Sequence, residues 1–219
     1  MTSSTSDGRL TLALPKGRIL DELLPLFQQA SIGMPDFAAS PRAMVFDAPE
    51  LPIRVLLLRG HDVPVYVAQG VADVGVAGQD VISEYDADLY SPLDLGIGLC
   101  WMSLIGLPGH DPREMQLGRP MRVATKFPRI AMRYFEKRGQ SAQMLHLHGN
   151  VELAPLCGLS DCVVDLVSTG ETLKRNGLVD YHRFQRITSR LVCNRAAYRL
   201  RFDAVNDMIG ALRTQLIGS

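Results

Sequence analysis

Short apolar runs alternate with helical stripes along this sequence, and this alternation constrains the fold more than any other feature. The first apolar run, residues 10–14, ends at the turn Pro15-Lys16-Gly17-Arg18 and leads into a helical pattern. The apolar residues of that helix recur at helical spacing: Ile19, Leu20, Leu23, Leu24 and Phe27. Because helices that connect strands favour parallel pairing, we expect a mostly parallel sheet that is covered on both faces.

The same alternation continues through the first half of the chain. A second strand is predicted at residues 53–58 and a third at residues 72–76. Between them, Asp62 is expected to cap a helix that has Pro64 in its first turn. Residues 78–83 then predict the start of another short helix. These elements make up a first α/β unit.

A second α/β unit is predicted after the loop at residues 108–112. Its strands and helices are expected at residues 121–125, 128–137, 144–148, 151–157 and 162–167. A final amphipathic helix from about Phe202 is expected to return to the first unit. The predicted organisation is therefore a disordered tail at residues 1–8, domain I from residues 9–103 and 183–219, and domain II from residues 104–182.

Charge and cysteine content exclude several functions. The 23 Lys and Arg residues equal the 23 Asp and Glu residues, so no net positive field gathers nucleic acid or an anionic membrane. The four cysteines form no Cys-x-x-Cys pair, and no His and Cys residues have the spacing of a metal site. The first residues are polar, and no later run reaches the roughly 18 apolar residues of a membrane span. We expect a cytoplasmic protein that binds no nucleic acid, no membrane and no metal of its own.

The stretch from Val163 to Leu173 carries the most informative chemistry. An apolar strand breaks into Ser168-Thr-Gly-Glu-Thr172 before a short helix. Because Gly170 has no Cβ, the backbone can approach a ligand closely, while the hydroxyls and the helix N-terminal amides supply donors for a phosphate group. A capping box is the alternative, in which Ser168 and Glu171 satisfy the same amides without a ligand. The local pattern leaves both open.

Asp165 shifts the balance toward a ligand. A carboxylate beside phosphate-binding amides is poorly placed unless it binds sugar hydroxyls or helps to hold a metal ion. Phosphate, ribose and metal together indicate a phosphoribosyl ligand. An apolar strand, an acid and then Thr-Gly-x-Thr, as found here, resembles the phosphoribosyl-diphosphate (PRPP) loop of phosphoribosyltransferases. The common salvage enzymes of that class carry two adjacent acids, whereas this loop has one.

Six further segments stand in a specific order and spacing. They are Leu14–Arg18, Leu58–Arg59 with Asp62 and Pro64, Gly70–Gly78, Arg122–Lys126, Val151–Pro155 and Gly158–Asp161. In this order the chain resembles the short form of ATP phosphoribosyltransferase, the first enzyme of histidine biosynthesis, from its opening strand almost to its C-terminus. The resemblance implies two α/β domains with a central cleft, like those of type II periplasmic solute-binding proteins.

The resemblance also implies roles for individual residues. The residues expected near the triphosphate and the leaving diphosphate, as the catalytic set, are Lys16, Arg18 and Arg42. The residues expected to bind ATP are Lys16, Gly17, Arg59 and Asp73. The residues expected to bind PRPP are Glu152, Asp165, Ser168, Thr169, Gly170, Glu171 and Thr172. Arginine suits these roles because its planar fork matches phosphate oxygens.

Each of these residues also has a purely structural interpretation. Lys16 and Arg18 are solvated surface charges in that interpretation, although the helix dipole disfavours cations at a helix start, and Arg42 and Lys126 are ordinary surface residues. Arg59 and Asp62 form a salt bridge, Asp73 is paired inside the protein, and Glu152 stabilises a helix N-terminus. His146 and His148 are ordinary strand residues, because no third metal ligand stands at a suitable spacing.

By the same resemblance, the adenine N1 of ATP attacks C1 of the phosphoribosyl group as diphosphate leaves, and Mg²⁺ is carried on the diphosphate or triphosphate. A separate regulatory subunit resembling histidyl-tRNA synthetase is the expected partner, in a hetero-octamer, because the short forms lack the histidine-binding domain of the long forms. The rival functions are a salvage phosphoribosyltransferase that uses a free base and a non-catalytic solute-binding module.

Overall fold

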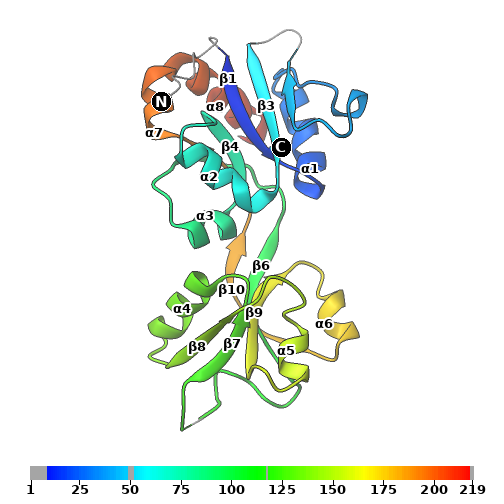
Figure 1. Cartoon of the computed structure of the whole chain (residues 1–219), viewed down its shortest axis with the longest axis vertical. Helices are drawn as coiled ribbons and strands as arrows, with labels where there is room; N and C mark the ends of the chain where they lie inside the picture. Colours follow the sequence, from blue (N-terminus) through cyan, green and yellow to red (C-terminus); the bar gives the residue numbers. More distant parts are fainter. Residues whose placement is uncertain (1–8, 49–51, 117, 218–219) are drawn as a thin grey trace. The chain divides into compact units, whose positions relative to one another are not determined.

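The computed structural model describes residues 9–48, 52–116 and 118–217, which form two compact units (Figure 1). Of the described residues, those between 9 and 98 and between 188 and 217 form unit 1, and those between 99 and 187 form unit 2. The expected boundaries at residues 103 and 183 fall inside strands β6 (Cys100–Gly106) and β10 (Val179–Ile187). These two strands pair with each other along their length, so the whole of each belongs to unit 2. The predicted tail at residues 1–8 lies outside the described residues.

Unit 1 is built on a six-stranded sheet, here called sheet A, with the strand order β2-β3-β1-β4-β11-β5. Its strands are β1 (Leu10–Pro15), β2 (Val45–Asp47), β3 (Ile53–Leu58), β4 (Val74–Gly78), β5 (Tyr90–Asp94) and β11 (Ser189–Cys193). Its helices are α1 (Arg18–Gln29), η1 (Phe37–Ala39), η2 (Gly60–Asp62), α2 (Val63–Ala68), α3 (Gln79–Tyr85), α7 (Arg195–Leu200) and α8 (Phe202–Ile217).

Helices cover both faces of sheet A, as the alternating pattern predicts. Leu12 and Leu14 of β1 pack on one face with Leu23 and Phe27 of α1 and with the buried stripe of α8. The other face carries Ala13, which packs with residues of α2. Every second residue of β1 thus faces α1 and α8, and the residues between them face α2.

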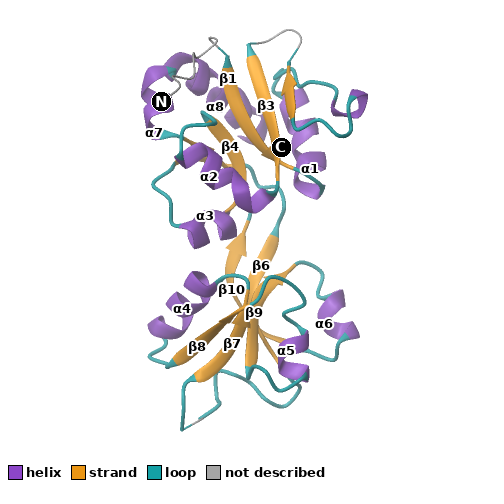
Figure 2. Cartoon of the chain, in the orientation of Figure 1, coloured by secondary structure: helices purple, strands orange, loops and turns teal. Residues whose placement is uncertain are grey.

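Unit 2 is built on a five-stranded sheet, here called sheet B, with the strand order β10-β6-β9-β7-β8 (Figure 2). Its remaining elements are β7 (Met121–Thr125), α4 (Pro128–Lys137), β8 (Ala142–His146), α5 (Leu153–Leu156), β9 (Cys162–Val167) and α6 (Glu171–Arg175). One face of sheet B packs against α4, and the other packs against the residues around α5 and α6.

Both sheets are mixed, which corrects the expectation of a mostly parallel sheet. Pairing is parallel for β3, β1 and β4 and for β8, β7 and β9, the strands that helices connect. It is antiparallel where β2, β5 and β11 join sheet A and where β6 and β10 join sheet B. The expectation failed because β10, β2 and β5 were not predicted as strands, and the direction in which a strand joins a sheet depends on pairing with distant segments. No helix in the described part of the chain is long and apolar enough to cross a membrane.

Candidate active site

The carboxyl ends of β1 and β3 bring the basic turn and Arg59 to one edge of sheet A. These strands are parallel, with Pro15 opposite Leu58, and the Lys16 N–H donates to the Leu58 carbonyl at 2.9 Å. The next residues of both strands therefore leave the sheet side by side. In open α/β sheets this carboxyl edge is where ligands bind.

Arg42 reaches the same edge from a different part of the sequence. Strand β2 runs antiparallel to β3, with Val45 opposite Leu56, so the loop that precedes β2 lies at the carboxyl end of β3. Arg42 stands in that loop and is exposed, and the Lys16 ammonium contacts the Met44 sulfur. The tertiary structure thus gathers Lys16, Arg42 and Arg59, although a third of the unit's sequence separates them.

Gly17 holds the basic turn in a conformation that suits glycine. Its φ of 78° lies in the left-handed region, and a Cβ built on it meets no atom within 4 Å. The requirement for glycine is therefore a backbone requirement, and the space beside it is open. Arg18 follows as the first residue of α1, and its Nε lies 3.7 Å from the Glu22 carboxylate.

The predicted roles of Asp62 are not realised. Its side chain makes no capping hydrogen bond to α2, because a turn of 3-10 helix, η2, precedes that helix. It also forms no ion pair with Arg59 in the described structure, and its carboxylate lies 3.3 Å from His61 Nε2 instead. The salt bridge with Asp62, which was the structural interpretation of Arg59, is therefore absent from the described residues. The Arg59 side chain is exposed.

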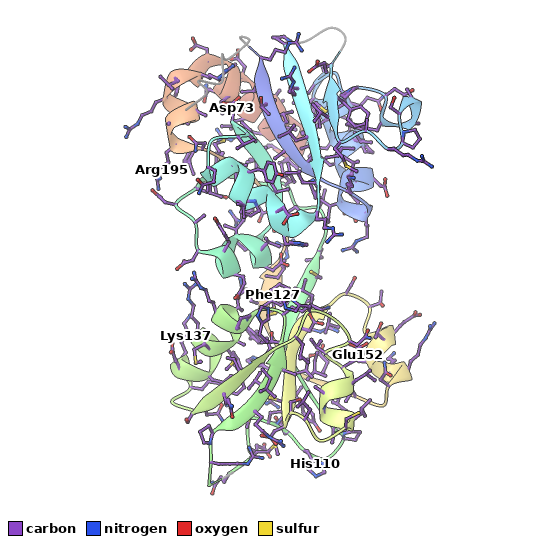
Figure 3. The ribbon with its side chains drawn as sticks, in the orientation of Figure 1. Asp73, His110, Phe127, Lys137, Glu152 and Arg195 are labelled. Carbon is purple, nitrogen blue, oxygen red and sulfur yellow. The ribbon has the colours of Figure 1, made fainter. Side chains whose placement is uncertain are left out.

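Asp73 lies at the opposite edge of sheet A, just before β4 (labelled in Figure 3). Its Oδ2 accepts from the Thr11 N–H at 2.8 Å, and its Oδ1 lies 3.5 Å from Arg201 Nε. Thr11 is near the start of β1, which runs parallel to β4. A strand of this length spans roughly 16 Å, so the structure does not bring Asp73 to the edge that carries Lys16 and Arg59.

Unit 2 contains a cavity of about 380 Å³ at the carboxyl edge of its parallel strands. Its lining includes all seven residues expected to bind PRPP: Glu152, Asp165, Ser168, Thr169, Gly170, Glu171 and Thr172. Three loops meet there, because β7, β8 and β9 are parallel and end at the same edge. Lys126 follows β7, Glu152 lies in the segment after β8, and the hydroxyl-rich loop follows β9.

The loop after β9 leaves the N-terminus of α6 without a capping side chain. The N-cap residue is Gly170, with φ 78°, and no side chain of the described residues caps the helix there. The contact nearest to a cap joins the Glu171 N–H to Thr169 Oγ1 at a long 3.4 Å. The predicted capping box between Ser168 and Glu171 is therefore not formed, and the Glu171 carboxylate lies 3.7 Å from Arg175. The side chains of Ser168, Thr169 and Thr172 are exposed.

Asp165 lies at the base of this cavity, with 19% of its side chain exposed. Burial raises the pKa of its carboxyl, and the Leu166 N–H, which donates to Oδ1 at 2.9 Å, and the Lys126 ammonium oppose this rise. The Glu152 carboxylate raises the pKa of Asp165 further. A ligand that donates hydrogen bonds to both carboxylates would relieve this electrostatic cost.

Two cavity residues were missed or undervalued from the sequence. Asn150 lines the cavity with a φ of 47°, and the Gly-Asn dipeptide was the signal, since Asn tolerates this left-handed region. Lys126 is more than a surface lysine, because it lies beside Asp165. His146 and His148 lie close together, with ring centroids 4.7 Å apart. The described residues contain no group of three or more His, Cys, Asp or Glu side chains placed to hold a metal ion.

The motif segments 122–126 and 158–161 are joined by an ion-pair cluster beneath this site. Asp161 accepts from Arg119 at 2.7 Å and 2.8 Å and from Arg122 Nη2 at 2.9 Å. It also accepts from the Arg122 N–H at 2.8 Å. These donors hold the pKa of the Asp161 carboxyl well below its usual range. The cluster fixes the start of β9 against β7, the two strands that lead to the cavity.

The two mixed sheets place the chain among proteins with the type II periplasmic-binding-protein fold, as expected. A domain of BvgS from Bordetella pertussis shares the fold alone, with a TM-score of 0.59 at 14% identity over 94% of this chain and 88% of that one. Residues 59–214 match the ATP phosphoribosyltransferase family. The chain belongs to this family, whose enzymes transfer the 5-phosphoribosyl group of PRPP to N1 of ATP in the first step of histidine biosynthesis.

Individual relatives from this family match the chain over nearly their whole length. The ATP phosphoribosyltransferases of Halalkalibacterium halodurans and Bacillus subtilis are each 43% identical over 203 residues, which cover 93% of this chain and 94% and 93% of theirs. The solved ATP phosphoribosyl transferase (HisG:HisZ) complex from Thermotoga maritima contains a chain with a TM-score of 0.80 at 31% identity. That match covers 96% of this chain and 100% of the other.

Proposed function

We propose that the unit 2 cavity binds PRPP and that the carboxyl edge of sheet A binds the triphosphate of ATP. The observation that carries this proposal is the uncapped loop at Gly170 beside the partly buried Asp165. Its backbone amides and exposed hydroxyls suit the 5-phosphate, since a phosphate accepts from such donors. Asp165 and Glu152 suit the ribose hydroxyls, which donate to carboxylates.

The basic residues at the edge of sheet A suit the second substrate. Three segments of the chain contribute four basic residues to this edge: Lys16, Arg18, Arg42 and Arg59. All four side chains are exposed. We assign Lys16, Gly17 and Arg59 to ATP, and Lys16, Arg18 and Arg42 to the triphosphate and the leaving diphosphate. Asp73 is assigned a structural role instead of a role in ATP binding, because both of its oxygens face protein donors.

The chemistry asks little covalent work of the protein. The sugar passes through a cation-like transition state as N1 of adenine approaches C1 and diphosphate departs, so catalysis rests on alignment and on stabilisation of the leaving charge. Lys16, Arg18 and Arg42 supply fixed positive charge for the phosphates. Asp165 and Glu152 hold the ribose, and no side chain acts as a nucleophile.

Mg²⁺ enters this reaction as part of the substrates, on the diphosphate or triphosphate. It supplies further screening of the charge that builds on the leaving diphosphate. In this proposal the carboxylates of Asp165 and Glu152 bind the ribose hydroxyls, so the phosphate oxygens of the substrates hold the ion. Titration of activity with Mg²⁺ at fixed PRPP would support this assignment if activity follows the concentration of the magnesium-bound donor.

A separate regulatory subunit completes the proposed enzyme. The solved structural relative from Thermotoga maritima is a HisG:HisZ complex, which supports a partner of the same kind for this chain. We propose a subunit resembling histidyl-tRNA synthetase, assembled with the chain in a hetero-octamer in the cytoplasm. Light scattering of the co-purified complex tests the stoichiometry.

The reaction itself is tested with two acceptors and one donor. The chain, alone and with its cognate subunit, is incubated with PRPP, Mg²⁺ and either ATP or free adenine. We expect an adduct at N1 of ATP and none with adenine. Conversion of adenine but not of ATP would assign the chain to the salvage class, and binding of PRPP without turnover of either acceptor would leave a binding module.

A further inference from the structure

Ser103 stands in the middle of β6, a strand whose other inward residues are apolar. Its side chain is 0% exposed, and among the described residues its hydroxyl has no hydrogen-bond partner. A buried hydroxyl without a partner loses its hydration and gains nothing in return. The family reaction and the proposed site, as described so far, give this hydroxyl no role.

The strand register places Ser103 directly beside Asp165. Strand β6 is antiparallel to β9, with Ser103 opposite Asp165 and Ile105 opposite Val163. Directly opposed residues project from the same face of a sheet, with Cβ atoms about 5 Å apart. Ile105, Val163 and Asp165 all line the unit 2 cavity, so Ser103 lies on the cavity face of the sheet, next to Asp165.

The residue opposite Ser103 on the other neighbouring strand already has an ion-pair partner. Arg183 of β10 is opposite Ser103, but its Nε donates to Asp180 Oδ2 at 2.8 Å. The neighbouring strands carry two carboxylates, Asp165 of β9 and Asp180 of β10, and the buried Oδ1 of Asp180 has no partner among the described residues. Of the two, Asp165 is directly opposite Ser103 and lines the cavity, whereas Asp180 is opposite Ile105. The Asp165 carboxylate accepts from the Leu166 N–H and faces Lys126.

We infer that Ser103 is a positioning residue for Asp165, and that its hydroxyl donates to the inner side of this carboxylate when the ribose hydroxyls of PRPP bind to the outer side. This inference rests on the proposed role of Asp165 in PRPP binding. The Ser103 hydroxyl gives Asp165 a donor from within the protein, so that the carboxylate stays ionised and aimed at the sugar in a largely apolar setting.

The test compares two serines that share the same property. Ser160 is also buried, and its hydroxyl also has no partner among the described residues, but it precedes β9 at the end of the strand far from the cavity. Ser103→Ala and Ser160→Ala therefore make the same chemical change at a matched burial. Neither removes a hydrogen bond of the substrate-free protein, so both variants should fold with a thermal midpoint close to that of the wild type.

The kinetic readout is measured on the full chain with its cognate subunit. Ser103→Ala should raise the KM for PRPP about tenfold, the size expected for a lost hydrogen bond to a charged group, with the KM for ATP unchanged. The acid limb of its kcat profile, which reports the substrate-bound enzyme, should move to higher pH, because losing a donor to the ionised carboxylate raises the pKa of Asp165 in that complex. The other charged groups that face this region are the same in both variants: Lys126, Glu152, Glu171, Asp180 and Arg183.

Asp165→Asn separates the two possible failures. If Asp165→Asn weakens PRPP binding while Ser103→Ala behaves like Ser160→Ala in both KM and pH profile, the role of Ser103 is wrong and the PRPP site stands. If Asp165→Asn binds PRPP as the wild type does, the proposed PRPP site fails, and the role of Ser103 fails with it. A selective change in Ser103→Ala supports both.

Discussion

The Lys126 ammonium lies 3.6 Å from Oδ2 of Asp165, at the carboxyl ends of two adjacent parallel strands. The sequence does not indicate this pairing, because 38 other residues separate Lys126 from Asp165. The lysine offsets part of the cost of burying the carboxylate, and 40% of its side chain remains exposed toward solvent. In the proposed PRPP site, both charges face the bound sugar phosphate.

Replacing Lys126 with methionine should weaken PRPP binding. The change removes a cation from the cavity and also raises the pKa of Asp165 further, because the ammonium favours the ionised carboxylate. We expect the KM for PRPP to rise by about tenfold, with partial recovery in Lys126→Arg. Lys137→Met, at the exposed end of α4 (labelled in Figure 3), is the matched control. Equal kinetics in the two methionine variants would return Lys126 to an ordinary surface role.

Thr169→Val and Asp165→Asn should each weaken the donor site without unfolding the chain. The first removes a hydroxyl that we assign to the phosphate, and the second removes the negative charge that we assign to the ribose. Each should cost on the order of 1–3 kcal/mol in transition-state binding. Calorimetry with PRPP checks both variants. Wild-type affinity in both, with the fold intact by circular dichroism, would mean that the loop after β9 does not bind the donor.

Asp73→Asn should lower stability and spare ATP binding. The variant keeps the size of the side chain but weakens the bond from the Thr11 N–H and the pairing with Arg201, so we expect the free energy of unfolding to fall by about 1–2 kcal/mol. Urea denaturation and the KM for ATP are the two measurements. Arg59→Gln is the opposite case, with a raised KM for ATP and unchanged stability. A large rise in the KM for ATP in Asp73→Asn at unchanged stability would restore its assignment to the ATP site.

The Asp161 cluster should make the stability of unit 2 depend on pH in the acid range. Because the two arginines hold the pKa of Asp161 below its unfolded value of about 4, the stabilisation is fully present above that pH. It is lost as the pH falls through the lower pKa of the folded state. Asp161→Asn should therefore cost about 2 kcal/mol at pH 7, a value reduced for the partial exposure of both arginines.

Denaturation of the wild type and Asp161→Asn at several pH values checks this sign. The difference between the two proteins should shrink steadily below about pH 4. Asp88→Asn is the control, since its pair with Arg195 is largely exposed and should contribute nothing measurable. A difference that grows toward acid would show that another group controls the acid stability.

Histidine should inhibit the assembled enzyme and leave the isolated chain unaffected. Allosteric inhibition requires an effector that binds two arrangements unequally, and we assign the effector site to the regulatory subunit. Activity and histidine binding are titrated with and without that subunit, which should also raise the basal activity. Saturable inhibition of the isolated chain, at a site that PRPP and ATP do not compete for, would contradict the proposed division of labour.

The strongly periodic elements of this protein could be read from the sequence alone. Strands β3, β7 and β9 and helix α4 begin and end where the periodic pattern predicts, because each buries one local face or a continuous apolar run. The hydroxyl-rich loop after β9 was equally visible, since a strand that ends in small polar residues before a helix is a local signal.

The predicted ends of strands that pair with distant segments were less accurate. Strand β8 begins at Ala142, two residues before its predicted start, because pairing with Met121 of β7 sets its register. Strand β10 carries alternating and charged residues, and its membership of sheet B depends on pairing with β6. Such pairing is a property of two segments together, so neither segment predicts it.

The sequence by itself indicated the candidate site residues, and the tertiary structure decided which of them meet. Lys16, Arg42 and Arg59 meet because the order and direction of β1, β2 and β3 bring their ends to one edge. Asp73 belongs to an equally recognisable motif, yet it falls at the other end of β4, where Thr11 and Arg201 occupy its oxygens. The period of a strand fixes the face on which a side chain lies, whereas the edge of the sheet that it reaches depends on long-range pairing and strand direction.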